Sequence, residues 1–382
     1  MKRKVVYCIP SLHFPSGMER VLTLKANYFA DVLDYEVYVI LTDNKEQEPY
    51  YKLSPKIKII NLDINFDTKR NVPVYKKFFL YLIKQYKYKC KLRELLFEIK
   101  PDITISTLRR EINFINSIKD GSKKIGEIHF SRSHYRDMEF DGRKSIVKRI
   151  ISNLWMSQLI RELKKLSMFV TLSSEDNDRW IEVKNRKFIY NPLSFFPDKV
   201  SECKTKQVIA VGRYTYQKGF DMLIESWKYI KEKHPDWVLK IYGGGERKDF
   251  IKLRDSFGLE ENVFLESSSD NIIDKYCESS IFVLSSRFEG FGMVITEAMA
   301  CGLPAVSFEC PSGPRDIIND GEDGLLVENG NIKQLAEKIS YLIENDELRK
   351  EMGKKARINV EKFKIENIAK QWNELFDTVL NK

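Results

Sequence analysis

Arg-Phe-Glu-Gly-Phe-Gly-Met-Val-Ile-Thr-Glu-Ala-Met-Ala-Cys-Gly-Leu-Pro, residues 287–304, is the stretch that decides the fold of this chain. The apolar run Ile281–Leu284 precedes it, and a helix-like run, residues 294–300, follows the turn Gly290-Phe291-Gly292. This order predicts a buried strand, a glycine loop and the N-terminus of a helix. Because the first N–H groups of a helix have no partner within it, we expect an anion-binding site at this loop.

The same stretch carries two carboxylates eight positions apart, Glu289 and Glu297. We expect Glu289 in the loop and Glu297 about two turns into the helix. Carboxylate oxygens accept hydrogen bonds from sugar hydroxyls, so two of them beside an anion site suit the recognition of a sugar. The alternative is a surface loop with two solvated glutamates. The strand, the glycine turn and the helix taken together favour the functional interpretation.

The rest of the chain alternates in the same way between apolar strand-like runs and helix-like runs. A length of 382 residues exceeds one ordinary core, so two domains are expected. The alternation over residues 1–192 and again over residues 203–362 predicts two doubly wound α/β domains with parallel sheets. A polar, proline-containing linker lies between them, near residues 192–203. Ligands are then expected at the carboxyl ends of the strands.

Two basic residues follow the first predicted strand of the second half. Gly212-Arg213 ends that strand, and Lys218-Gly219 opens the next helix. Two positive charges at a strand end and a helix start suit a diphosphate, and glycine allows its close approach to the backbone. The alternative is a pair of solvated loop charges.

Two further candidates lie in the first half. Gly17 closes the loop after the first strand, and a plain turn is the alternative there. His129 closes the predicted strand 124–128, and His134 follows five residues later. A lone histidine is more often structural, so the residue alone does not establish a site role.

These motifs together resemble those of a known family. Glu289-Gly290-Phe291-Gly292 with Glu297-Ala298 is similar to the Glu-x7-Glu signature of retaining glycosyltransferases of family 4, which have the GT-B fold of two Rossmann-like domains facing a central cleft. The spacing Gly-Arg-x4-Lys-Gly at residues 212–219 resembles the diphosphate site of that family. Gly17-Met18-Glu19-Arg20 resembles its Gly-Gly-x-Glu-Arg loop, with Ser16 in place of one glycine. The likeness extends along most of the chain.

The resemblance implies a role for each candidate. Residues 1–192 would bind the acceptor and residues 203–362 the nucleotide-sugar, with a last helix, residues 363–382, packing back on the first domain. The implied catalytic residues are His129, Arg213, Lys218 and Glu289. His129 would bond a sugar hydroxyl near C6, Arg213 and Lys218 would neutralise the leaving diphosphate, and Glu289 would contact donor-sugar hydroxyls. The implied substrate-binding residues are Gly17, Arg213, Lys218, Glu289, Gly290, Phe291, Gly292, Met293 and Glu297, the last on the ribose hydroxyls.

The implied reaction transfers a sugar, with retention, from a nucleotide-sugar to a hydroxyl of a glycan acceptor. We expect a UDP-hexose or UDP-N-acetylhexosamine as donor and a polyprenyl-diphosphate-linked acceptor, as in bacterial surface-polysaccharide or lipid-linked oligosaccharide synthesis. No cofactor or metal is expected, because Arg213, Lys218 and a helix N-terminus would replace the cation. The alternatives are a non-catalytic nucleotide-sugar- or glycan-binding protein and a nucleotide-sugar epimerase of the same fold.

Composition limits the remaining possibilities. Hydrophobic residues make up 43% of the chain and charged residues 31%, and no apolar run reaches the ~18 residues that cross a bilayer. The basic then apolar N-terminal run stops at Pro10, so we expect no signal peptide and a cytoplasmic protein. The six scattered cysteines are expected to be reduced thiols. Asp137-Met138-Glu139 superficially resembles a metal clamp, but it lies in a polar loop-like stretch.

Charge is uneven within a net charge of +9. Residues 69–110 hold twelve basic residues against three acids, interleaved with aromatic residues over an expected long helix from 74 to 99. An anionic membrane surface, carrying a lipid-linked acceptor, is one expected partner and would make the protein peripheral on the inner face of the plasma membrane. A solvated helix face with buried aromatics is the main alternative. Nucleic acid is the weakest of the three, and we expect none to bind.

Overall fold

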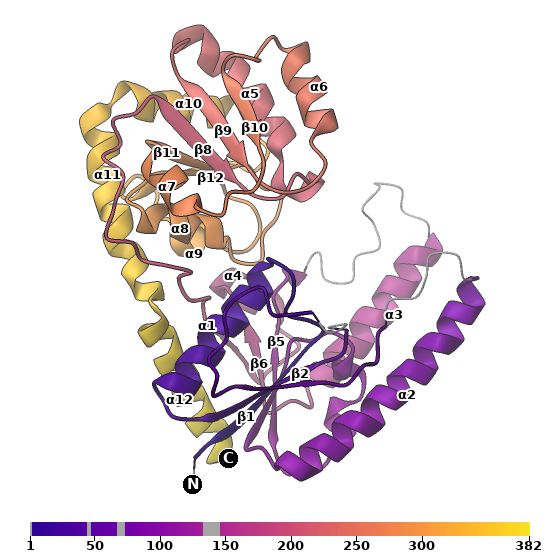
Figure 1. Cartoon of the computed structure of the whole chain (residues 1–382). Coiled ribbons are helices and arrows are strands. Elements are labelled where there is room, and N and C mark those ends of the chain that lie inside the picture. The colour runs from indigo at the N-terminus through magenta and orange to yellow at the C-terminus, as the bar shows by residue number, and fades with distance from the viewer. Residues whose placement is uncertain (1, 44–46, 67–72, 133–145) are drawn as a thin grey trace. The chain divides into compact units, whose positions relative to one another are not determined.

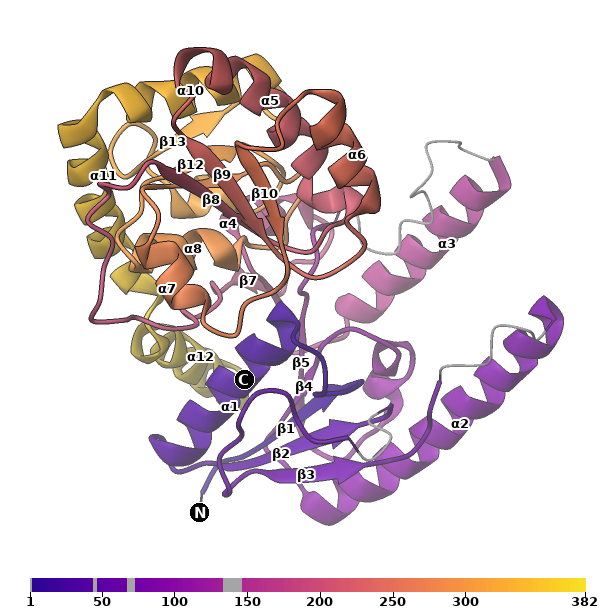
Figure 2. The ribbon, with the colours of Figure 1, turned by 45° about the horizontal axis from the view of Figure 1, so that its top comes forward.

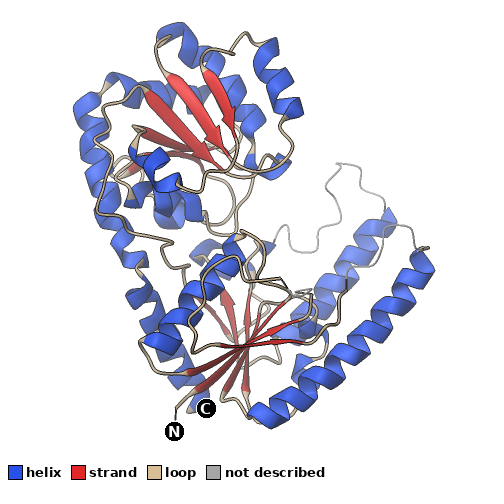
Figure 3. Ribbon diagram, viewed as in Figure 1, coloured by secondary structure: helices blue, strands red, loops and turns tan. Residues whose placement is uncertain are grey.

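The computed structural model describes residues 2–43, 47–66, 73–132 and 146–382. The chain forms two compact units. The first comprises Met1–Leu172, Asp176–Pro192 and Ile365–Lys382, and the second comprises Ser173–Glu175 and Leu193–Lys364. Each unit is a parallel sheet between helices, as the colouring in Figure 3 shows.

The sheet of the first unit has seven strands in the order β3-β2-β1-β4-β5-β6-β7. All its pairings are parallel. Its strands are β1 (Lys4–Ile9), β2 (Glu36–Leu41), β3 (Lys58–Asn61), β4 (Ile103–Ser106), β5 (Lys123–Glu127), β6 (Met168–Thr171) and β7 (Arg186–Phe188). The central strands are buried on both faces, as a sheet covered by helices on both sides requires.

The sheet of the second unit has six parallel strands in the order β10-β9-β8-β11-β12-β13. Its strands are β8 (Gln207–Val211), β9 (Val238–Tyr242), β10 (Val263–Glu266), β11 (Ile281–Leu284), β12 (Ala305–Phe308) and β13 (Gly324–Val327). In both sheets the first strand lies in the middle and the chain winds outward on each side of it. This is the doubly wound order, so the predicted α/β class is confirmed.

Helices cover both sheets (Figure 1). Those of the first unit are α1 (Gly17–Asp31), α2 (Val74–Ile99), α3 (Ile146–Leu163), most of α4 (Ser174–Arg179) and α12 (Ile365–Leu380). Those of the second are α5 (Phe220–Lys233), α6 (Lys248–Ser256), α7 (Ile272–Cys277), α8 (Met293–Ala300), α9 (Pro314–Ile317), α10 (Ile332–Glu344) and α11 (Asp346–Asn359). Short 3-10 turns lie at Glu111–Asn113, Ile115–Ser117, Tyr216–Lys218 and Val360–Phe363.

The last helix belongs to the first unit. The apolar face of α12 is buried, and its Phe376 ring lies 5.5 Å from that of Phe29 on α1. Arg3, at the start of the chain, donates hydrogen bonds to Asn373 (2.8 Å) and Asp377 (2.5 Å) on α12. The two ends of the chain are therefore joined within one core.

Several elements differ from expectation. Helix α8 begins at Met293, so Glu297 is its fifth residue and lies about one turn in, not two. Strand β5 ends at Glu127, so His129 lies two residues beyond it rather than at its end. Five elements were not expected at all: α4, β7, α9, β13 and α11. Four of them have six residues or fewer, too few for a clear periodic pattern.

The basic, aromatic helix α2 has the expected bounds but two different halves. Its C-terminal half packs against the sheet, and Tyr88, Leu92 and Leu96 are buried there. Its N-terminal half projects beyond the strands, as Figure 2 shows, and large apolar side chains are exposed all around it. The exposed set is Tyr75, Phe78, Phe79, Leu80, Tyr81, Leu82, Ile83 and Tyr86. The alternative in which these aromatics are buried is wrong for this half.

Candidate functional site

The topology marks one place in each sheet for a ligand. In the second unit β8 and β11 are neighbours whose following connections run to opposite sides, which creates a crevice at their carboxyl ends. Strand β8 leads directly into Gly212-Arg213, and β11 leads through Ser285 and Ser286 to Glu289. Two segments that are far apart in sequence thus meet at this switch point.

Lys218 and Glu289 form an ion pair at that point. The Lys218 Nζ lies 2.6 Å from the Glu289 Oε1, and the Ser286 hydroxyl donates to the same oxygen at 2.6 Å. The two charged side chains are only 15% and 8% exposed. A carboxylate held by two donors in a mostly buried place has a defined orientation, as a recognition site requires.

The loops that carry this pair are fastened to one another. The Ser285 hydroxyl donates to the Lys218 carbonyl at 3.0 Å, and the Gln217 amide donates to the Phe288 carbonyl at 3.0 Å. Gly219 has φ +61°, and a Cβ there would lie 2.1 Å from the Ser285 carbonyl oxygen. Only glycine fits this close approach, so Lys218 and Glu289 are positioned by backbone as well as by charge.

Arg213 differs from Lys218 in having no side-chain hydrogen bond or ion pair within the described ranges. Its side chain is exposed at the carboxyl end of β8. A guanidinium in such a position can bind an incoming anion without first losing a partner.

The glycine loop after Glu289 has the predicted form. Gly292, with φ +95°, is the residue that precedes α8, so the first turn of the helix begins at Met293 beside Gly290. The Phe291 ring is buried and lies 5.5 Å from that of Phe363. The loop is thus anchored in the core, and the helix N-terminus lies in the same segment as Glu289.

Glu297 is buried, with 4% of the residue exposed. Its Oε1 accepts a hydrogen bond from the Ser194 hydroxyl at 2.6 Å, and its Oε2 lies 3.3 Å from the Tyr276 hydroxyl, which donates to it. Both oxygens are therefore already bonded to hydroxyl groups. A ribose would have to share or replace these bonds, and the ribose role of Glu297 stays a prediction.

In the first unit, Gly17 is the first residue of α1 and is exposed. Ser16 caps that helix, because its hydroxyl accepts from the Glu19 N–H at 3.4 Å. The Glu19 carboxylate in turn accepts from the Phe14 N–H at 2.8 Å, which closes the loop. Burial raises the pKa of Glu19 to about 7. The serine in place of a glycine is thus a helix cap.

His129 lies just past the carboxyl end of β5, and its side chain is 5% exposed. Its Nε2 is 3.5 Å from the Glu127 Oε1 and makes no well-aligned hydrogen bond to any described residue. Glu127 is itself ion-paired with Lys25 from α1, and both side chains are almost completely buried. Sequence reasoning missed Lys25 and Glu127. His134 lies outside the described residues.

Arg109 and Arg110 belong to the basic stretch 69–110, but they lie after β4 and not on the helix α2. They follow the strand that neighbours β1, at the switch point of the first sheet. Arg110 pairs with Asp43 at 2.9 Å, and Arg109 lies over the Phe130 ring at 4.8 Å. In the sequence these arginines come directly after the apolar run of β4, and that position already distinguishes them from the basic residues of α2.

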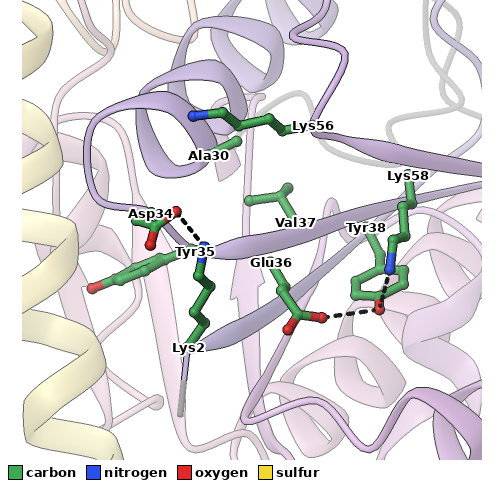
Figure 4. A pocket seen from close by; sticks show the side chains of 9 residues that line it. All are labelled: Lys2, Ala30, Asp34, Tyr35, Glu36, Val37, Tyr38, Lys56 and Lys58. Atoms are coloured by element: carbon green, nitrogen blue, oxygen red, sulfur yellow. Dashed lines mark hydrogen bonds and ion pairs between the residues drawn. The ribbon is translucent and has the colours of Figure 1, made fainter.

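The small pocket in Figure 4 does not lie at the carboxyl ends of the strands. That pocket, of about 150 Å³, is lined by Ala30 near the end of α1 and by residues at the starts of β1, β2 and β3, among them Lys2, Asp34 and Glu36. Lys2 and Asp34 are paired with each other at 2.6 Å. It therefore lies at the opposite end of the first sheet from His129.

In the described parts of the chain, no group of three or more His, Cys, Asp or Glu side chains is arranged to hold a metal. Asp137 and Glu139 lie outside those parts. The expectation of metal-independent chemistry thus remains a prediction. No helix within the described ranges is both long and apolar enough to cross a membrane.

Comparison with known proteins identifies the family. An uncharacterized glycosyltransferase of Haemophilus influenzae is 30% identical over 97% of this chain and 99% of that protein. Residues 194–359, which contain Arg213, Lys218, Glu289 and Glu297, match the family described as glycosyl transferases group 1. The chain belongs to the group 1 glycosyltransferases.

Two further comparisons concern a relative and a fold. The poly(ribitol-phosphate) α-N-acetylglucosaminyltransferase of Staphylococcus aureus is 31% identical over 69% of this glycosyltransferase and 52% of that protein, so the alignment covers about half of that relative. A crystal structure of an S. aureus TarM mutant with fondaparinux, α-GlcNAc-glycerol and UDP has a TM-score of 0.78, 21% identity and coverage of 98% and 99%. The predicted GT-B fold is confirmed, and the glycosyltransferase activity with it.

Proposed function

We propose that this glycosyltransferase is a retaining enzyme of family 4 that transfers a hexose or N-acetylhexosamine from a UDP-sugar to a hydroxyl of a glycan acceptor in bacterial polysaccharide synthesis. The observation that carries the proposal is the Lys218–Glu289 pair beside the exposed Arg213 at the switch point of the second sheet. The UDP in the TarM complex and the N-acetylglucosaminyl group in the name of the S. aureus relative support a UDP-sugar donor.

In this proposal the donor diphosphate lies against Arg213 and Lys218. The bond between the sugar C1 and the diphosphate oxygen breaks while a bond from C1 to the acceptor oxygen forms on the same face. The acceptor proton passes to the departing diphosphate, so the protein supplies no nucleophile. Negative charge grows on the diphosphate as it leaves, and two cationic side chains stabilise it there. Glu289 accepts hydrogen bonds from the donor sugar hydroxyls.

A neutral substitution of Glu289 tests this arrangement. If a phosphate oxygen contacts the far side of the Lys218 ammonium, it lies about 5 Å from the Glu289 carboxylate, where like charges repel by about 1–3 kcal/mol in a partly hydrated site. Glu289→Gln removes that repulsion. We expect UDP to bind about 5- to 100-fold more tightly while sugar transfer falls by about 100-fold or more, because the sugar hydroxyls lose their charged acceptor.

Calorimetry with UDP and a transfer assay with UDP-sugars measure the two effects. Glu202→Gln is the matched control, because Glu202 forms an exposed ion pair with Lys204 (2.8 Å) in the segment that precedes β8, at the opposite end of that strand. Weaker UDP binding in Glu289→Gln, or unchanged transfer, would contradict the proposed site. A panel of UDP-, GDP- and ADP-sugars identifies the base and sugar, and NMR of the anomeric proton of the product distinguishes retention from inversion.

We further propose that the acceptor is lipid-linked and that the N-terminal half of α2 binds an anionic membrane surface, which makes the enzyme peripheral on the inner face of the plasma membrane. The support is the exposed apolar set on that half together with exposed Lys76 and Lys87 on the same helix. Apolar side chains that enter the interface and lysines that meet anionic head groups are the two components of such binding.

Sedimentation with vesicles tests this second proposal. Ile83→Ser on α2 is compared with Ile358→Ser on α11, since the two isoleucines are similarly exposed at 63% and 70%. We expect Ile83→Ser alone to weaken binding to vesicles that contain phosphatidylserine, by roughly tenfold from the apolar area removed. Equal binding by wild type and both variants, or no preference for anionic over neutral vesicles, would refute it.

A further inference from the structure

An exposed aromatic side chain lies in the loop after β8, and the function proposed so far makes no use of it. Tyr216 is the first residue of the 3-10 turn Tyr216–Lys218 and is 65% exposed. Single apolar side chains are common on protein surfaces, so exposure alone carries no function. Tyr216 differs from such residues because its ring is held in one orientation.

One face of the Tyr216 ring lies on a guanidinium. The Arg287 Cζ is 4.0 Å from the ring centroid, a distance at which a cation and the face of an aromatic ring attract each other. Arg287 donates to both oxygens of the Asp221 carboxylate, at 2.8 and 2.6 Å, and to the Tyr216 carbonyl at 2.8 Å. The forked ion pair fixes the plane of the guanidinium. The ring is therefore fixed on one face, while its other face lies in solvent.

The backbone beside this stack is fixed as well. The Arg287 N–H donates to the Gln217 carbonyl at 2.8 Å, which joins the loop after β11 to the loop after β8. Lys218 follows Tyr216 by two residues in one loop, and Glu289 follows Arg287 by two residues in the other. The stack and the Lys218–Glu289 ion pair thus join the same two loops at neighbouring places.

We propose that the outer face of the Tyr216 ring is a platform on which the pyranose ring of the donor sugar stacks. The inference rests on the proposed function, in which the diphosphate lies against Arg213 and Lys218, on either side of Tyr216 in its loop. The face of an aromatic ring is negative, and the C–H bonds of a pyranose face are slightly positive, so the two attract each other.

The charges and the order of the stack favour a neutral sugar face over an anion. Arg287, behind the ring, is already paired with Asp221, so the stack offers no free positive charge to a phosphate or carboxylate. A ring that is already fixed loses little rotamer freedom when a ligand covers it, so more of the contact energy appears as affinity.

Tyr216→Leu removes the aromatic ring and keeps an apolar side chain. Calorimetry with UDP, UDP-glucose and UDP-N-acetylglucosamine separates the contribution of the sugar, because the ratio of the Kd for a UDP-sugar to the Kd for UDP isolates it. We expect Tyr216→Leu to weaken UDP-sugar binding by about 3- to 10-fold and to leave UDP binding unchanged. Tyr216→Phe keeps the ring and should retain the ratio of the wild type. The matched control is Tyr341→Leu, since Tyr341 is 47% exposed on α10 of the same unit.

The same titrations distinguish a platform from a residue that only holds the loop. A purely structural tyrosine would weaken UDP and UDP-sugar by the same factor in Tyr216→Leu, and that result would overturn the platform. An unchanged UDP-sugar affinity in Tyr216→Leu, or a loss in Tyr216→Phe as large as in Tyr216→Leu, would overturn it too, with the proposed function intact. A wild-type protein that binds neither UDP nor a UDP-sugar would instead overturn the proposed donor, and the platform with it.

Discussion

Gly219 allows the strongest quantitative test of how the loops after β8 and β11 are held together. It has φ +61°, and a Cβ at this residue would lie 2.1 Å from the Ser285 carbonyl oxygen. Gly258, which follows α6, has nearly the same backbone, φ +63°, but no atom within 4 Å of its Cβ position. Alanine therefore meets the same backbone penalty at the two positions, and the two variants differ only in the steric contact of the new Cβ.

The magnitudes follow from these two terms. Left-handed backbone costs an alanine about 1–2 kcal/mol, and this is the whole cost expected for Gly258→Ala. In Gly219→Ala the Cβ and the oxygen must separate by roughly 1 Å to reach an ordinary contact, and such overpacking adds about 1–3 kcal/mol or more. We expect Gly219→Ala to cost about 2–5 kcal/mol of unfolding free energy in total.

Denaturation by urea, followed by far-UV circular dichroism and by tryptophan fluorescence, measures the loss of unfolding free energy in each variant, provided that the slope of the transition is unchanged. The shift of the Ser285 backbone in Gly219→Ala should also move Lys218, because the Ser285 hydroxyl donates to the Lys218 carbonyl. UDP affinity should therefore fall in Gly219→Ala and not in Gly258→Ala. Equal free-energy losses in the two variants, within about 0.5 kcal/mol, would refute the idea that the loops after β8 and β11 are in close backbone contact.

Three further outcomes are expected. Burial raises the pKa of Glu19 to about 7, so the folded state binds the Glu19 proton more tightly than the unfolded state does, and this contribution to stability is full below about pH 4.5 and lost as the pH rises through 7. Glu19→Gln should therefore gain about 1–3 kcal/mol of unfolding free energy over wild type between pH 5 and pH 8 in urea melts. A gain that is independent of pH would contradict the assignment. Trp372→Ala should destabilise the first unit by about 3–5 kcal/mol, because the indole is buried under the Lys25 ammonium; a loss similar to that of a surface substitution would show that α12 is not part of that core. Transfer should persist in EDTA, because in the proposed site Arg213 and Lys218 would supply the positive charge that a metal otherwise brings. A loss of transfer that Mg²⁺ or Mn²⁺ restores would show that a cation is needed.

Sequence reasoning predicted much of the fold because its evidence is local. Buried parallel strands are short apolar runs, and the helices between them repeat their apolar residues with the period of the helix, so most strands and the bounds of α2 are readable without a structure. Elements without such a pattern were missed. Strand β7, for example, has three residues, two of them basic, and lies at the edge of the sheet. The residues directly after a strand, such as Arg213, can also be found from the sequence, because the carboxyl ends of parallel strands share one edge of the sheet.

By itself, then, the sequence determined the α/β class, the order of the main elements and the strand ends that carry Arg213, Lys218 and Glu289. The tertiary structure alone decided which of them meet. Lys218 and Glu289 are 71 positions apart, and Lys25 and Glu127 are 102 apart. Their contacts depend on the lateral order of strands and on where α1 lies over the sheet, which no window of neighbouring residues encodes. The same holds for α2, whose exposed half is defined by where the sheet ends rather than by its own pattern.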